Sequence, residues 1–181
     1  MRVSTPSAAM DDAAKTQGVQ PTKQADKLVP EQPTLRFAVG IFDTWADAHA
    51  TMRELTAAGM AESNFNFLGL HRVLSEGLAR HDDPRLLRDL PFPGNADLTS
   101  ATDGPLAVCL AARLRAGKET VMTALAHWLI PRHAKQLQDA AAAGKVILWV
   151  QVFDNDQERR AYRSLLARSS NSVGVHDIVG A

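Results

Sequence analysis

The chain has 181 residues, of which 45% are apolar and 22% charged, enough for one compact domain with a substantial core. Lysine and arginine together number 20, as do aspartate and glutamate, so no net positive charge favours nucleic acid or an anionic membrane. The single cysteine, Cys109, excludes an internal disulfide framework and a cysteine-rich zinc site.

Residues 1–33 are rich in polar residues and contain no aromatic residue, so we expect a disordered tail. The start of the chain has no apolar run typical of a signal peptide, which predicts a cytoplasmic protein. The most apolar long window, 104–130, contains four charged residues and is not expected to insert into a membrane.

From Thr34 the pattern becomes that of a folded domain, 34–181. The apolar stretch RFAVGIF predicts a buried strand, and Thr44 with Asp47 is typical of a capping box that begins a helix. Gly59 would end this helix in a left-handed conformation. A second strand is expected in NFNFLGL, residues 64–70.

The C-terminal part repeats this order. KVILWVQVF predicts a third strand, Asn155 with Glu158 predicts the start of a helix, and SVGVHDIV predicts a fourth strand. IFDTWAD and VFDNDQE would then be the same strand-to-helix joint used twice, with their carboxylates capping helices and not binding a cation.

Two βαβ halves predict an α+β fold with the ferredoxin-like split βαβ topology and a four-stranded antiparallel sheet. The first and third strands should be central and the second and fourth should be edges. A mainly helical insertion, about 71–144, separates the halves; within it HDDPRLLRDLPFPGN is expected to form a loop with a helical turn. Because the third strand is apolar on both faces, the second face needs a cover. We expect the insertion to supply it, with a second subunit as the alternative.

The segments FAVGIFDTWADAHATMRELTAAGM, NFNFLGL, WLIPRHAKQLQDAAAAGKVILWVQVFDNDQERRAYRSLL and VGVHDI together resemble the bacterial heat-induced or general-stress-protein family of small α/β domains. The charged stretch PLAVCLAARLRAGKET stands where many relatives carry a glycine-rich segment. The resemblance implies a stress-linked or regulatory domain and supplies no functional residues.

Motifs for catalysis and cofactor binding are weak. Gly117 and Lys118 lack the earlier glycine and the following serine or threonine of a phosphate-binding loop. The six histidines form no metal-binding pair of the metalloprotease type, although a turn at Pro131 could bring His127 and His133 together. We therefore expect no metal, no cofactor and no enzyme activity.

Two groups of residues are candidate sites. Trp149, Gln151 and His176 could converge on one face of the sheet beside the small residues Ala38, Gly40 and Gly174, which would form a small-molecule pocket. The alternative is close packing, in which the small residues accommodate Trp149 and an inserted helix.

Phe92, Trp128, Ile130 and Arg132 could form an interaction surface, since aromatic residues with arginine are favoured in interface hot spots. The alternative is that they are buried within the monomer. The sequence thus predicts a noncatalytic regulatory or interaction module that binds itself or a protein partner through an edge strand or the insertion. A small-ligand sensor using Trp149 and His176 is the alternative function.

Overall fold

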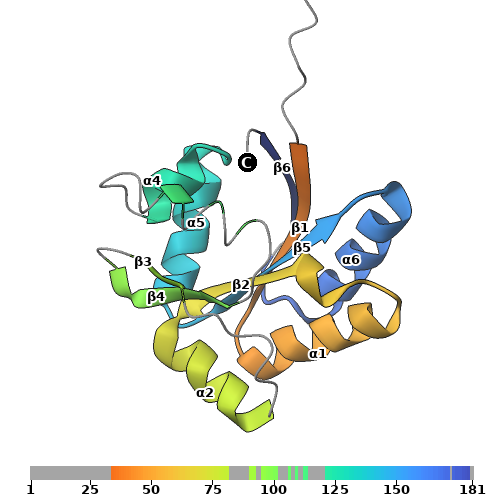
Figure 1. Cartoon of the computed structure of the whole chain (residues 1–181), viewed down its shortest axis with the longest axis horizontal. Helices are drawn as coiled ribbons and strands as arrows, with labels where there is room; N and C mark the ends of the chain where they lie inside the picture. The colour runs from red at the N-terminus through yellow and green to blue at the C-terminus, as the bar shows by residue number, and fades with distance from the viewer. Residues whose placement is uncertain are drawn as a thin grey trace, which may run out of the picture. The chain divides into compact units, whose positions relative to one another are not determined.

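Figure 1 shows the computed structural model of the chain, which describes residues 34–81, 90–92, 95–101, 106, 109, 112–113, 121–171 and 173–179. These residues belong to one compact unit, Gln32–Ala181. The predicted tail, 1–33, lies outside the described residues.

The four expected strands are present and adjacent. They are β1 (Thr34–Phe42), β2 (Phe65–Leu70), β5 (Val146–Val152) and β6 (Gly174–Val179), in the spatial order β2-β5-β1-β6. Every pairing among them is antiparallel, and the first and third expected strands, β1 and β5, are central as predicted. The α+β fold class is confirmed.

The sheet is larger than predicted, because β3 (Leu90–Phe92) and β4 (Asn95–Ala101) extend it to six strands in the order β3-β4-β2-β5-β1-β6. The second expected strand, β2, is therefore not an edge, and the inserted segment is not only helical. Leu90–Phe92 also corrects the expected loop around this proline-rich stretch. β4 reads NADLTSA, too polar to stand out in the sequence, yet β2 is apolar and buried along most of its length and needs a partner on both sides.

Helices cover both faces of the sheet. One face packs against α1 (Trp45–Ala57), α6 (Asn155–Arg168) and α2 (His71–His81), with Phe42, Met52 and Leu165 among its buried residues (Figure 1). The other face packs against α4 (Val121–Ala126) and α5 (Pro131–Ala142). The expectation that the inserted segment covers the second face is confirmed.

The two strand-to-helix joints differ by one residue in the position of the helix N-cap, counted from the phenylalanine that both share. At the first joint the expected capping box forms, since the Asp47 backbone N–H donates to the Thr44 hydroxyl at 3.1 Å. At the second joint the predicted cap by Asn155 and Glu158 is wrong. Asp154 is the N-cap, and its side chain accepts hydrogen bonds from the backbone N–H groups of the second and third residues after it. Phe42 is consequently buried within β1, whereas Phe153 follows the end of β5 and is 67% exposed. The joints are similar in sequence and not equivalent in structure.

β6 stops pairing with β1 before β1 ends. Along β1 the last residue paired with β6 is Val39, opposite Gly174. Further along β1, the backbone of Ile41 forms hydrogen bonds with serines that follow α6. Ile41 N–H donates to the Ser169 hydroxyl at 3.2 Å, and Ile41 C=O accepts from the Ser170 N–H at 2.8 Å. A pocket lies beside the start of β6, on the face covered by α5.

A candidate ligand pocket between α5 and β6

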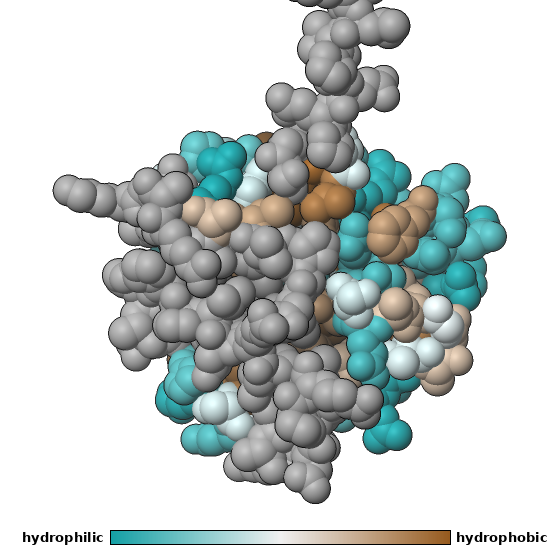
Figure 2. All heavy atoms as spheres, in the orientation of Figure 1, coloured by the Kyte–Doolittle hydropathy of each residue, from teal (hydrophilic) through white to brown (hydrophobic). Residues whose placement is uncertain are grey.

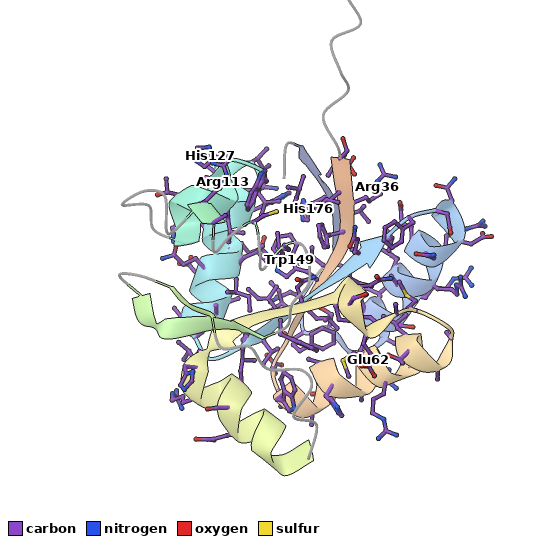
Figure 3. All side chains as sticks on the ribbon, in the orientation of Figure 1. Arg36, Glu62, Arg113, His127, Trp149 and His176 are labelled. Atoms are coloured by element: carbon purple, nitrogen blue, oxygen red, sulfur yellow. The ribbon has the colours of Figure 1, made fainter. Side chains whose placement is uncertain are left out.

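His133 and His176 come from different elements and meet at one end of this pocket. His176 lies in β6 opposite Phe37 of β1, on the sheet face that α5 covers. His133 lies in the first turn of α5, which begins at Pro131, a favourable first helical position for proline. The two imidazole rings contact edge to face, with centroids 5.4 Å apart and an interplanar angle of 71°. Figure 3 shows His176 between β6 and the region of α4 and α5.

The two histidines line a pocket of about 170 Å³. Its other walls come from the ends of β1 and β6 and from one side of α5, and its full lining is Val39, Ile41, His133, Gln136, Leu137, Val173, Gly174 and His176. The apolar residues come mainly from the sheet, whereas the polar residues come from α5 and β6. A pocket with an apolar wall and a few polar groups is the usual form of a small-molecule site.

Gly174 determines the position of the His176 ring. A Cβ atom at Gly174 would lie 2.8 Å from His176 Nε2 and 3.4 Å from its Cε1. Since real Cβ atoms essentially never come within 3.0 Å of another atom, the imidazole can fold back over the strand only because residue 174 has no side chain.

Trp149 of β5 lies on the same face of the sheet as His176 and contacts its ring. Its ring centroid is 6.2 Å from that of His176 and 6.0 Å from that of Phe37, and the side chain is completely buried (Figure 3). Among the described residues its indole Nε1 has no hydrogen-bond partner, and the same holds for the buried indole nitrogens of Trp45 and Trp128. Trp149 itself is not part of the pocket lining, so it contacts the His176 ring without contributing a wall.

Burial favours the neutral form of His176. Removal from solvent lowers the pKa of His176 below its ordinary value, and the neighbouring His133 lowers it further, while Asp177 acts in the opposite direction. Asp177 itself is bound by Arg36, with 2.7 Å between its Oδ1 and the arginine Nε, and this contact lowers the pKa of the carboxyl. Neutral His176 offers one donor and one acceptor at the pocket.

Only part of the predicted pocket comes together. Gly40 lies on the opposite face of the sheet from Trp149, because the register places Gly40 opposite Leu148 and Val39 opposite Trp149. A Cβ at Gly40 would lie 3.0 Å from Leu165 of α6, so this glycine accommodates α6 and not the tryptophan. The predicted convergence of Gly40 with Trp149 is therefore wrong.

Gln151 shares the sheet face of Trp149 but lines a different depression. This second hollow, of about 390 Å³, lies where β1 begins and β5 ends, and Arg36, Phe153 and Asp177 also line it. Of the four predicted ligand-binding residues, only His176 lines the pocket beside α5, and Trp149 contacts His176.

Sequence reasoning missed His133 and Gln136 as partners of His176. They flank Leu137, a buried residue of the amphipathic helix α5, so helical periodicity places them at the border of its buried stripe. The predicted meeting of His127 and His133 considered only the local turn. The ring contact that the structure shows for His133 is with His176 of β6, which no local pattern indicates.

The predicted interaction surface is divided between elements. Trp128 is partly buried against the core beneath α4 and α5, with the Arg113 guanidinium 5.1 Å from its ring centroid, in line with the predicted alternative of burial. Ile130 is 58% exposed, and Arg132 is also exposed. Phe92 lies in β3, and its side chain is outside the described part.

Within the described ranges, no group of three or more histidine, cysteine, aspartate or glutamate residues is arranged to hold a metal ion. No helix among the same residues is long and apolar enough to cross a membrane. Cys109 is partly buried, and burial raises the pKa of its thiol, while Arg113 lowers it. An un-ionised thiol is a poor nucleophile.

Comparisons with protein families, with curated proteins and with solved structures find no match to this chain. The resemblance to the general-stress-protein family stays a prediction from sequence.

Proposed function

We propose that this protein is a noncatalytic regulatory module that binds a small molecule in the pocket between α5 and β6. The observation that carries the proposal is the meeting of His133 and His176 at the open end of a pocket whose inner wall is apolar.

The lining chemistry favours binding over catalysis. The described residues around the pocket include no serine, cysteine, threonine or lysine that could act as a nucleophile. They also include no carboxylate to orient a histidine as a general base. The proposed cytoplasmic location and stress-related role rest on the sequence patterns alone.

The experiment is gentle purification of the full chain from the cells in which it occurs, followed by native mass spectrometry. The proposal expects a small molecule retained by the wild-type chain and by His71→Gln, a matched change of an exposed histidine in α2. His176→Gln and His133→Gln should each release it. Protein that carries no small molecule in either the wild type or the control, under conditions that keep the fold intact, would contradict the proposal.

A second candidate function is binding of a protein partner, as the sequence first suggested. On the outer face of α6, Tyr162 and Leu166 lie one turn apart and are 40% and 54% exposed. Arg163 lies beside them and forms no ion pair within the described part of the chain. Figure 2 shows hydrophobic side chains between hydrophilic ones on the visible surface around this helix. Tyrosine and arginine are common in interface hot spots, and the arginine favours an acidic partner.

The test of this candidate is the mass of the native complex by light scattering. Tyr162→Ser with Leu166→Gln should reduce a complex to the monomer mass, while Ala167→Ser, at an exposed position of the same helix, should leave it unchanged. β6, an outer strand of the described sheet, is the other predicted route of association. A complex that survives the double substitution would exclude α6 as its interface.

A further inference from the structure

The volume of the pocket limits the part of a ligand that lies inside it to about the size of one ring. At about 170 Å³ it is close to an apolar cavity of roughly 150 Å³ that is known to hold benzene in another protein. A nucleotide or a peptide would not fit inside it. The ligand is therefore a small molecule, or one small group of a larger molecule.

The walls divide the pocket into an apolar part and a polar part. Val39 and Ile41 of β1, Leu137 of α5 and Val173 before β6 offer only hydrocarbon, which suits a ring or a branched aliphatic group. The polar part is formed by His133, Gln136 and His176. A matching ligand has an apolar body and one polar end.

The polar part of the pocket suits an anionic group of a ligand better than a cation or a metal ion. No carboxylate lines the pocket among the described residues, so a ligand cation would find no counter-charge. The two imidazoles meet edge to face, and no third strong metal ligand stands beside them in the described part. His176 can instead take up a proton and become a donor at both nitrogens, and the His133 imidazole beside it can donate a hydrogen bond, which suits a carboxylate.

We propose that the pocket binds a small carboxylic acid with an apolar body of about one ring, whose carboxylate lies against His133 and His176. This inference rests on the proposed function, because it specifies the ligand of the same pocket.

Binding of the acid would be coupled to proton uptake. His176 faces His133 from α5, Phe37 from β1 and Trp149 from β5, so His133 is the titratable group among these three. Its neighbour Asp177 is held by Arg36 and lies outside the pocket lining, although its charge raises the pKa of His176 to a smaller extent than burial and His133 lower it. Burial and His133 lower the pKa of His176, so the empty pocket holds this imidazole neutral, and a bound carboxylate would favour its charged form.

The test is a titration of the full-length, isotope-labelled protein with benzoate, followed by backbone and imidazole NMR signals between about pH 7.5 and about pH 5.5. Because a carboxylic acid ionises well below this range, changes of affinity report protonation of the protein. We expect shifts at Val39, His133, Gly174 and His176. The affinity for benzoate should rise by about tenfold or more as the pH falls over this range. At each pH above the pKa of His176, lowering the pH by about one unit raises the protonated fraction, and with it the affinity, by about tenfold.

Matched probes and variants separate the possible outcomes. Benzamide has nearly the same shape as benzoate without its charge, and should bind more weakly and independently of pH. His176→Gln should reduce benzoate affinity and flatten its pH dependence, His133→Gln should reduce the affinity, and His71→Gln should change neither. Backbone spectra of each variant report whether it is folded, and His133→Gln, at the surface end of the pocket, keeps the test usable if His176→Gln unfolds.

Four results would overturn the inference. Equal, pH-independent binding of benzoate and benzamide, or binding of Zn²⁺ alone, would show that the pocket takes a ligand that is not an acid, and the proposed function would survive. If benzoate causes no shifts while the native protein retains a non-acidic small molecule, the ligand is again not an acid and the proposed function survives. Absence of shifts together with no retained molecule would contradict both proposals.

Discussion

Replacing Gly174 with alanine tests whether this glycine positions His176. The new Cβ would lie 2.8 Å from His176 Nε2, so the ring must retreat until the contact reaches the ordinary range that begins at 3.4 Å. The atom that must move is the far end of a side chain, and a forced rotamer change costs about 0.5–1.5 kcal/mol. Loss of glycine freedom in the unfolded chain stabilises the protein by about 0.4–1 kcal/mol. The free energy of unfolding should therefore change by less than about 1 kcal/mol.

The imidazole signals should change although stability does not. In the wild type the His133 ring lies edge to face with the His176 ring, 5.4 Å between centroids, so each ring alters the chemical shifts of the other. Gly174→Ala moves the His176 ring and should shift the His133 ring protons toward their values in His176→Gln. The assay is an NMR spectrum of the imidazole protons, together with urea unfolding of each variant.

Gly40→Ala is the matched control on the opposite sheet face. There the Cβ would lie 3.0 Å from Leu165 Cδ2 and 3.2 Å from the Phe42 ring, inside a packed core. Overpacking of this kind typically costs about 1–3 kcal/mol, and it should leave the His133 signals unchanged. Unchanged His133 signals in Gly174→Ala, or shifted ones in Gly40→Ala, would refute the placement of the two glycines.

Three further changes probe the core, the corrected cap and the buried histidine. Trp149→Phe removes an indole N–H that has no hydrogen-bond partner among the described residues, so urea unfolding should place it within about 1 kcal/mol of the wild type, against a loss of about 3–5 kcal/mol for Trp149→Ala. In the same urea assay, Asp154→Ala should lower the free energy of unfolding by about 0.5–2 kcal/mol and Asn155→Ala by much less. A larger loss for Asn155→Ala would show that Asn155 is the N-cap, as the sequence predicts. Burial lowers the pKa of His176 below the value of 6.5 that it has in the unfolded chain, so the unfolded chain binds this proton more tightly than the folded one. The folded state therefore loses stability as the pH falls below 6.5, and it retains this stability at higher pH. His176→Gln should therefore flatten the fall in stability between about pH 7 and about pH 5, and an unchanged slope would contradict the burial of a neutral imidazole.

Features set by local sequence were predictable. RFAVGIF forms β1 because a short apolar run between polar residues suits a buried strand, and Thr44 begins α1 because its hydroxyl bonds the N–H three residues later. Gly59 ends the first helical segment with a φ of 90°, as expected for a left-handed stop. Each of these depends on residues within one or two turns of each other.

Features set by register between distant strands were not predictable. Side chains alternate along β1, so placing Gly40 on the Trp149 face required an assumption about pairing that was wrong by one residue. β4 was missed because a polar strand lacks the alternation that identifies a half-buried one. The contact of His133 with His176 depends on how α5 packs on the sheet, which becomes apparent only in the folded chain.

The most direct test of the central claim is a high-resolution crystal structure of protein purified gently from its own cells. We expect a small molecule in the pocket, with its apolar part against Val39 and Leu137 and its polar end in contact with His133 and His176. A retained molecule bound elsewhere on the protein, with the pocket filled only by water or closed by the two imidazoles, would contradict it.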